Sequence, residues 1–241
     1  EVRETAVQLL MQNPNDTRTT FEPLLDSNHN LMSRMTSAVL VRINKKYEAR
    51  IYEHIDIILA NIYLTINRML ALESLIDYPV VELVQSILSE ENDQALQEIF
   101  YLLGSIHGIK NVNIAVDAIN STIPRTRSNG IEALDVMLPL KPLAAIETLT
   151  NPDMSLEELS NYGSLTYETG SFTPAQVLRE LLDQHNQNWK VYVCIEALGE
   201  LGHNLTKKQA TPNASPLDLL MSSPSPVVQS NQADIPFTIQ E

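Results

Sequence analysis

Cysteine, glycine and phenylalanine are scarce in this chain, and each shortage narrows the possible folds. The 241 residues include one cysteine, seven glycines and four phenylalanines, although 44% of all residues are hydrophobic. Cys194 has no second cysteine with which to form an internal disulfide, so we expect a reducing compartment. It falls inside an apolar helical pattern, which favours a buried, inert thiol over a nucleophile. Few glycines beside a large apolar content favour helices over a β-sandwich or barrel.

Basic residues are also few. Sixteen lysines and arginines stand against thirty acidic residues, which gives a net charge of −14 at pH 7. Binding to nucleic-acid phosphates draws on clustered Lys and Arg, so this balance argues against a nucleic-acid partner. Solubility is the simplest explanation of the acidic surplus.

Long uncharged apolar runs are missing as well. The strongest run, from Ile55 to Leu72, is interrupted by Asp56, Asn61, Asn67 and Arg68. A membrane-spanning helix needs about twenty mostly apolar residues, so we predict a core helix and no direct membrane insertion by this segment. No secretory signal is visible, and the opening EVRETAVQLLM has the pattern of a repeat already under way, which predicts that the chain is cut from a longer protein.

The sequence also lacks a recognisable catalytic or metal-binding pattern. No histidine has a second His or a Cys at a zinc-ligand spacing, so all five are predicted on the surface or at helix ends: His29, His54, His107, His185 and His203. Glu90, Glu91 and Asp93 form a carboxylate cluster, for which a solvated helix face is favoured over an acid–base pair. No Gly-rich phosphate loop or serine nucleophile elbow is found. We therefore predict a protein that is not an enzyme, with no cofactor and no metal.

What the sequence does have is a helical pattern, clearest from Gln94 to Leu138. Three apolar stripes follow one another at helical spacing; the first stops at Gly108, and a turn over residues 121–128 separates the other two. The stripes consist of Ile99, Leu102, Leu103 and Ile106, then Val112, Ala115, Val116 and Ile119, then Ile131, Leu134 and Leu138. Short antiparallel helices cannot bury their apolar faces alone, so we expect them to stack on neighbours as repeats.

The chain before this stretch is also predicted to be helical. Short helices are expected over residues 1–12 and 20–25, followed by a long helical pattern over 31–76. Its length predicts a break near Asn44-Lys45-Lys46. Pro79 is predicted to open the next helix, and residues 79–107 form either one helix or two with a joint at 89–93.

After Leu138, further short helices separated by two loops are predicted. Pro139 and Pro142 bracket a turn into a helix over 143–149, Asn151-Pro152-Asp153 is a loop, and Thr173 caps a helix that runs to about residue 184. Ser155 and Glu158 have the spacing of a capping box, and the Gly-, Ser- and Thr-rich residues 161–171 predict a loop.

The last part of the chain divides into a helix and a tail. Residues 189–201 are predicted to pair with the helix before them. From residue 205 to 241 the Pro, Ser, Asn and Gln content predicts a flexible linker that contributes nothing to the fold, with Leu217 to Met221 as its only apolar island.

The central segments LQEIFYLLGSIHGIKNVNIAVDAI and RTRSNGIEALDVML resemble a HEAT-repeat module, of the armadillo-like class, found in bacteria beside transporter domains of the ATP/ADP-translocase or major-facilitator type. In that family a helix ending in Phe-x-Leu-Leu-Gly precedes a short helix, then a turn with Arg and Asn leads into Ala-Leu-Glu-x-Leu-Asp. The matching positions here are Phe100, Leu102, Leu103, Gly104, Arg125, Arg127, Asn129, Glu132, Ala133, Leu134 and Asp135.

A second match, LLDQHNQNWKVYVCIEALGELG at Leu181 to Gly202, is similar to the next helix pair of that module. Two positions depart from the family: Gly130 stands where Ala is usual, and Cys194-Ile195 replaces small residues. The resemblance covers roughly residues 47–202 and is carried by packing residues. It implies an all-α, right-handed HEAT-like α-solenoid over residues 1–204, followed by the tail at 205–241.

The resemblance also implies a role. The expected function is a non-catalytic scaffold or regulatory module that binds a protein partner or adjacent domains of its parent chain. That parent would be a transporter-like membrane protein, for example for nucleotide transport, with this module tethered on the cytoplasmic side. The alternative is an enzyme on a HEAT scaffold, of the bilin lyase type, which needs a pocket with convergent polar groups. A HEAT-like nucleic-acid repair protein is disfavoured by the charge of −14.

A cyclic-nucleotide-binding domain often follows the module in this family. No arginine and no Gly-rich turn follow Gly202 in this chain, so we predict that the chain itself binds no cyclic nucleotide.

Arg125, Arg127 and Asn129 are the candidate partner-binding residues. They are predicted at the start of a helix, where backbone N–H groups also point outward toward a partner's carboxylate or phosphate. The simpler alternative, which we favour, pairs the arginines with acids of the neighbouring repeat. Exposed ion pairs contribute about 0–1 kcal/mol, so such pairs would align repeats more than hold them together.

Overall fold

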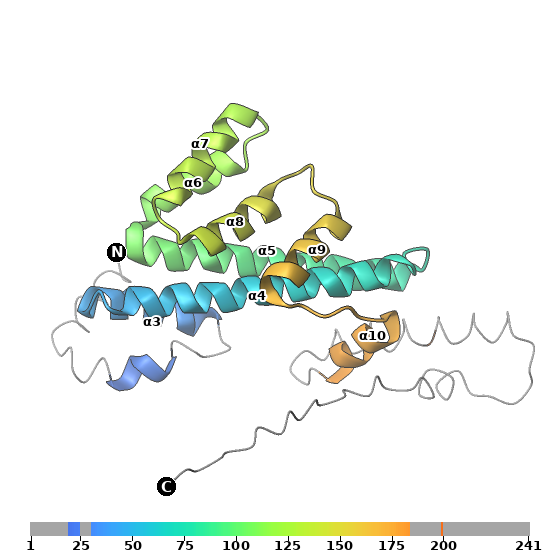
Figure 1. The fold of residues 1–241 in the computed structure, drawn as a ribbon. Helices are drawn as coiled ribbons and strands as arrows, with labels where there is room; N and C mark the ends of the chain where they lie inside the picture. Colours follow the sequence, from blue (N-terminus) through green and yellow to red (C-terminus); the bar gives the residue numbers. More distant parts are fainter. Residues whose placement is uncertain (1–18, 25–29, 184–198, 200–241) are drawn as a thin grey trace, which may run out of the picture.

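The computed structural model describes residues 19–24, 30–183 and 199, and these residues are helical or lie in turns between helices, with no strand among them (Figure 1). The all-α prediction is confirmed. The elements are η1 (Glu22–Leu24), α3 (Asn30–Ile43), α4 (Tyr47–Glu73), α5 (Pro79–His107), α6 (Ile109–Ile119), α7 (Pro124–Asp135), α8 (Leu140–Thr150), α9 (Leu156–Tyr167) and α10 (Pro174–Asp183). The helices expected over 1–12 and 189–201, and the tail from 205, lie outside the described residues.

Two long helices form the centre of the fold. α4 has 27 residues and α5 has 29, and they pack against each other as a hairpin. Pro79 opens α5 at its first turn, as predicted, where its missing N–H costs no hydrogen bond. Gly108 ends α5 with a φ of 90°, a conformation that favours glycine. α5 is one continuous helix, so the alternative of two helices with a joint at 89–93 is not realised.

The long helical pattern before α5 is broken where the sequence predicts. α3 ends at Ile43 and α4 begins at Tyr47, and the amide N–H of Lys46 bonds to the side-chain oxygen of Asn44 at 3.0 Å. An Asn side chain that binds its own backbone competes with helical hydrogen bonds, which explains the break. The short helix expected over 20–25 is also present, as a helical turn at 19–21 followed by η1.

α6 and α7 form a short antiparallel hairpin after Gly108. Val112, Ala115 and Ile119 of α6 and Leu134 of α7 are buried, so the predicted stripes are the packed faces. The turn predicted over 121–128 is too long, because α7 already begins at Pro124. Proline fits the first helical turn, so the Pro that suggested a turn starts the helix instead.

α8 and α9 follow as two further short helices. Pro142, expected to bracket a turn, lies inside the first turn of α8, which starts at Leu140. The capping box of α9 is confirmed: the Ser155 side chain accepts from the Glu158 N–H at 3.2 Å, and the Glu158 carboxylate accepts from the Ser155 N–H at 2.7 Å.

The loop prediction for residues 161–171 is wrong over its first seven residues. α9 continues to Tyr167, and Gly163 is buried inside it. The reason is tertiary: a Cβ atom on Gly163 would lie 2.7 Å from the Cβ of Tyr63 on α4, so the glycine is there to let two helices approach.

α10 packs near the C-terminal end of α4 and belongs to a second, smaller core. Thr173 caps it as predicted, since its Oγ1 accepts from the Gln176 N–H at 3.3 Å. Val177, Leu178 and Leu181 of α10 meet Leu72 of α4 and three buried residues of α5, Val81, Val84 and Leu88. The larger core joins α4 and α5 to α6, α7 and α8.

The helices α6 to α9 lie along one side of the α4–α5 hairpin, and α10 lies on the other side of α4 in the view of Figure 1. In a plain solenoid each helix pair contacts mainly the pairs next to it in the chain. Here α4 also contacts α8, α9 and α10. The side-chain amide of Asn67, for example, donates to Thr169, 102 residues further along the chain.

Among the described residues, one helix, α4, is long and apolar enough to cross a membrane by length and composition alone. Its residues Ile51, Ile55, Leu59 and Ile62 are buried in the larger core. These four residues pack as the core helix predicted for residues 55–72 would, and the exclusion of membrane insertion stays a prediction.

Candidate functional site

The three candidate partner-binding residues lie on the first half of α7. Arg125 and Asn129 are exposed and Arg127 is half-buried. Neither arginine takes part in an ion pair with any residue that the structure describes, although Arg50–Glu22, Arg68–Glu180 and Lys141–Asp56 do form such pairs. The favoured pairing with acids of the neighbouring repeat is therefore not found in this part of the chain. The structure also separates the three residues: Arg127 faces α8, whereas Arg125 and Asn129 line no described cavity.

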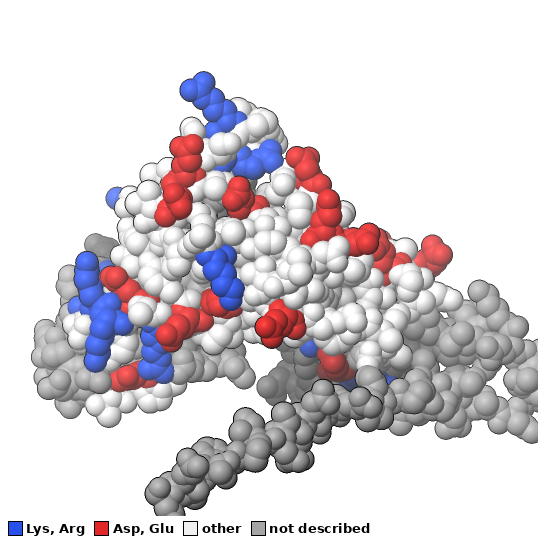
Figure 2. Space-filling view, in the orientation of Figure 1, with Lys and Arg blue, Asp and Glu red and all other residues white. Residues whose placement is uncertain are grey.

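Arg127 lines a cavity of about 380 Å³ between α7 and α8. The walls carry charges of both signs together with hydroxyl and amide groups. From α7 come Pro124, Arg127, Ser128, Ile131 and Glu132, and from the end of α8 come Glu147, Thr150 and Asn151. We call this space the charged cavity. Figure 2 shows Lys and Arg side chains over α7 and, beside them, Asp and Glu side chains along the edge that leads toward α9.

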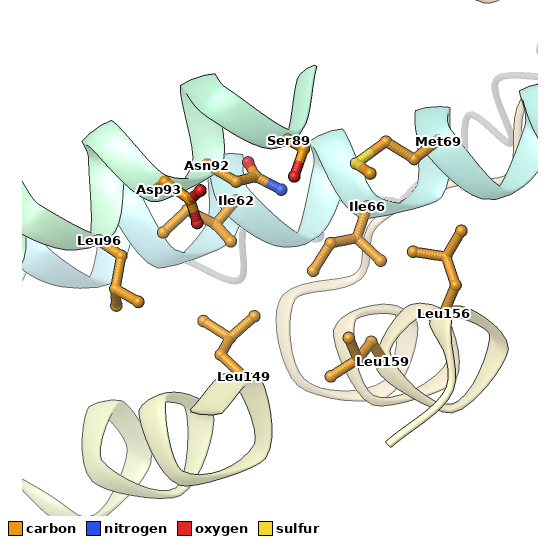
Figure 3. A pocket seen from close by; sticks show the side chains of 10 residues that line it. All are labelled: Ile62, Ile66, Met69, Ser89, Asn92, Asp93, Leu96, Leu149, Leu156 and Leu159. Carbon is orange, nitrogen blue, oxygen red and sulfur yellow. The ribbon is translucent and has the colours of Figure 1, made fainter. Parts of the chain in front are cut away.

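A second hollow lies on the other side of the α8 end, and its lining is mostly apolar. It has a volume of about 210 Å³ and opens between α4, α5, α8 and α9. Figure 3 shows the apolar side chains pointing into it from four helices, with Ser89, Asn92 and Asp93 of α5 on one wall. The apolar lining consists of Ile62, Ile66, Met69, Leu96, Leu149, Leu156 and Leu159. We call this space the apolar hollow.

The two spaces share the last turn of α8. Leu149 lines the apolar hollow, and its neighbours Glu147, Thr150 and Asn151 line the charged cavity. The turn is held in place from both sides: the Thr150 hydroxyl donates to the Ile146 carbonyl at 2.8 Å, and the Asn151 side chain accepts from the Asp153 N–H at 3.1 Å. A ligand in either space would therefore contact the same short segment.

Of the predicted carboxylate cluster, Asp93 lines the wall of the apolar hollow, and Glu90 and Glu91 line neither of the two spaces described above. Glu90 accepts a hydrogen bond from Gln94 one turn later, at 3.2 Å, as expected for a solvated helix face. The leucines of α8 and α9 that complete the hollow are not singled out by the sequence. Their spacing is that of ordinary core residues, and only the packing of four helices brings them together.

The two histidines in the described part of the chain sit in structural positions. His54 is half-buried on α4, and His107 is the last residue of α5, as predicted. His107 Nε2 lies 2.8 Å from the Tyr52 hydroxyl, which donates its single hydrogen to the Met137 carbonyl at 2.9 Å. His107 must then donate from Nε2. The arrangement ties α4 and α5 to the segment before α8.

A polar cluster joins α4, α8 and α9. The Lys141 ammonium lies 2.8 Å from the Asp56 carboxylate and 4.3 Å from the centre of the Tyr167 ring. Burial and then the charge of Asp56 raise the pKa of the Tyr167 hydroxyl. A tyrosine that stays protonated at neutral pH is a donor and not a base, so this cluster fits a structural role.

Within the described residues, no group of three or more His, Cys, Asp or Glu side chains is placed to hold a metal ion. No protein-family profile, curated protein sequence or solved structure matches the chain.

Proposed function

We propose that this chain is a non-catalytic helical interaction module, and that the apolar hollow receives a side chain of a partner protein or of an adjacent domain. The hollow is the single observation that carries the proposal. At about 210 Å³ it falls below the roughly 300–1,000 Å³ typical of small-molecule pockets. An apolar anchor residue that fills a hollow of this kind is the usual centre of a protein-binding surface.

Several features support this use of the hollow. Its lining comes from four helices that share one core, so a partner meets preformed walls and little ordering entropy is lost on binding. Polar groups at one wall, Ser89, Asn92 and Asp93, offer hydrogen bonds that would fix the orientation of the bound segment.

We also propose that α5 to α8 are HEAT-like repeats within a right-handed solenoid, attached in the parent protein to a transporter-like membrane domain on its cytoplasmic side. The successive packing of α5 on α6, α6 on α7 and α7 on α8 supports the repeat assignment. α4 also contacts α9 and α10, which are not its neighbours in the chain. These contacts would cover one side of the row of repeats.

A matched pair of substitutions tests the docking proposal. Leu149→Gln places an amide in the hollow, whereas Leu165→Gln changes a leucine of α9 that is 86% exposed and lines neither space. The measurement is cross-linking of each purified variant to membrane and soluble fractions of the source cells. Wild type and Leu165→Gln should give the same discrete adduct, and Leu149→Gln should lose it while keeping its helical circular dichroism. An adduct that survives Leu149→Gln would place the partner elsewhere.

Two further measurements separate the module from its rivals. Co-expression with a bilin pathway should leave the purified chain colourless, and a visible absorbance band at stoichiometric level would favour the bilin lyase alternative. Calorimetric titration with cyclic AMP and cyclic GMP should show no heat of binding, since a cyclic phosphate needs an arginine with several convergent amides. Micromolar binding would overturn the module as proposed.

A further inference from the structure

The charged cavity is lined by side chains of both signs that form no ion pair with one another in the structure. Arg127 from one side and Glu147 from the other line the same space of about 380 Å³, with Glu132 near them on α7. The structure records no ion pair between Arg127 and either carboxylate. Arg127 and Glu132 are five residues apart on one helix, which is not one of the spacings of three or four residues that place helical side chains next to each other. Glu147 belongs to a different helix, so the packing of α7 and α8 sets its separation from Arg127.

The volume and the polarity of the lining point to a small ligand. About 380 Å³ is within the roughly 300–1,000 Å³ of ligand pockets. The side-chain amide of Asn151 and the Ser128 hydroxyl are further donors, and the Thr150 hydroxyl, which donates to Ile146, keeps its lone pairs for the cavity. Ile131 and Pro124 supply a small apolar surface. The space is thus lined by one cationic side chain, two exposed carboxylates and several neutral hydrogen-bonding groups.

We propose that the charged cavity binds a free cationic α-amino acid such as lysine or arginine. The carboxylate of the ligand would lie against the Arg127 guanidinium, whose planar fork binds a carboxylate through two parallel hydrogen bonds. The α-ammonium and the side-chain cation would lie against Glu132 and Glu147. With one positive and two negative charges in the lining, a ligand of net charge +1 is the best electrostatic match.

Charge alone should distinguish a cationic amino acid from chemically related compounds in a binding experiment. A neutral amino acid such as leucine would satisfy Arg127 and only one carboxylate. Glutamate would bring a second negative charge against Glu132 and Glu147. A diamine without a carboxylate, such as 1,5-diaminopentane, would leave Arg127 without a partner. The expected order of affinity is lysine or arginine, then leucine and the diamine, then glutamate.

Isothermal titration of the whole chain with these five compounds at low ionic strength is the direct test. Arg127→Gln should weaken lysine binding by about tenfold or more, the loss expected for one charge-assisted pair, and should leave diamine binding unchanged or tighter. Glu147→Gln should reduce the preference for lysine over leucine and leave leucine binding nearly unchanged. Both side chains are at least partly exposed, so neither change should unfold the protein.

Two matched variants control for a general charge effect. Arg125→Gln removes an exposed arginine of the same helix, and Glu157→Gln an exposed glutamate of α9, and neither residue lines the cavity. Both should bind lysine as wild type does. Absence of lysine and arginine binding at millimolar concentrations, or equal loss from Arg125→Gln and Arg127→Gln, would overturn the proposal. Leu149 lines the apolar hollow and not the charged cavity, although the two spaces share the last turn of α8. The docking proposal is tested by Leu149→Gln and the amino-acid proposal by Arg127→Gln and Glu147→Gln, so the failure of one can be told from the failure of the other.

Discussion

Gly163 of α9 lies directly against Tyr63 of α4, so closely that a Cβ atom on the glycine would be 2.7 Å from the Tyr63 Cβ. The Tyr63 ring is then enclosed by Tyr162 and Tyr167, with ring centres 5.2 and 5.4 Å away. Its hydroxyl donates to the Ala145 carbonyl of α8 at 2.8 Å. Burial raises the pKa of this hydroxyl, which stays a donor. One close approach of two helices thus fixes the relation of α4, α8 and α9.

Gly163→Ala tests this contact. Overpacking of a close contact costs about 1–3 kcal/mol, and alanine regains up to about 1 kcal/mol of helix propensity. Because the opposing atom is a Cβ held by its own backbone, we expect a net loss of about 2 kcal/mol in urea unfolding. Gly170→Ala is the control, since a Cβ there meets no atom within 4 Å. Equal stability of the two variants would mean that α9 can move away from α4 at no cost.

Gly130→Ala tests the close packing of α7 on α6. A Cβ on Gly130 would lie 2.7 Å from the Ile119 amide nitrogen and 2.9 Å from the Ala115 carbonyl oxygen, both on the backbone of α6. Backbone cannot rotate away, so α6 and α7 must separate, and we expect a loss of at least about 2 kcal/mol. Asn129→Ala, an exposed neighbour on the same helix, should be neutral or slightly stabilising. A Gly130→Ala variant as stable as wild type would show that α6 and α7 can move apart without a loss of stability.

Leu134→Ala removes the most buried apolar side chain of α7, which has 0% exposure. Creation of a cavity at such a site costs about 2–5 kcal/mol. Leu134 belongs to the core shared with α4 and α5, so faster hydrogen exchange should extend beyond α7. Val136→Ala, at an 85% exposed position, should change stability by less than about 0.5 kcal/mol. A similarly small effect of Leu134→Ala would contradict the packing of α7.

The positions of the helices could be predicted largely from periodicity, proline and capping residues, because these signals act within a few residues. The break at Asn44, the opening at Pro79 and the Ser155–Glu158 box are of this kind. Residues 161–167 could not be predicted, because Gly163 looks like a loop residue until the partner Tyr63, a hundred residues earlier, is in place. Local propensity was overridden by a tertiary contact.

The two candidate binding spaces could likewise be predicted only in part from the sequence. Arg127 could be singled out from the sequence, but its environment depends on Glu147 and Asn151 of another helix. The leucines of the apolar hollow carry no sequence signal at all, since their spacing is that of any buried helix face. Sites assembled across helices in this way become visible only when the packing is known.

Tyr52→Phe removes the hydroxyl that links three parts of the fold. The Met137 carbonyl and His107 Nε2 would both lose their partner, and unpaired polar groups of this kind cost about 1–3 kcal/mol. The site is only half-buried and water can partly replace the hydroxyl, so we expect a loss of about 1 kcal/mol in thermal unfolding. Tyr162→Phe is the matched control, because the structure records no hydrogen bond from that hydroxyl to a described residue. Equal melting temperatures for wild type and Tyr52→Phe would show that the link adds nothing.

The capping box of α9 predicts how stability depends on pH. Hydrogen bonds from the backbone and then the side chain of Ser155 lower the pKa of Glu158 below its usual 4.5. A carboxylate whose pKa is lower in the folded state stabilises the fold above the unfolded pKa, and that contribution disappears as the pH falls through the folded value. The contribution should therefore be complete at neutral pH and should decline from about pH 4.5 downward.

Glu158→Gln isolates this effect, because the amide oxygen can still accept from the Ser155 N–H but carries no charge. The variant should melt at a lower temperature than wild type at pH 7, and the two melting curves should converge as the pH is lowered to 3. Glu157→Gln, in the same first turn but without a hydrogen bond to Ser155, should keep the pH dependence of wild type. A melting difference between wild type and Glu158→Gln that stays constant from pH 7 to pH 3 would contradict an ionised, hydrogen-bonded cap, and would mean that the amide fails in the capping box for a steric reason instead.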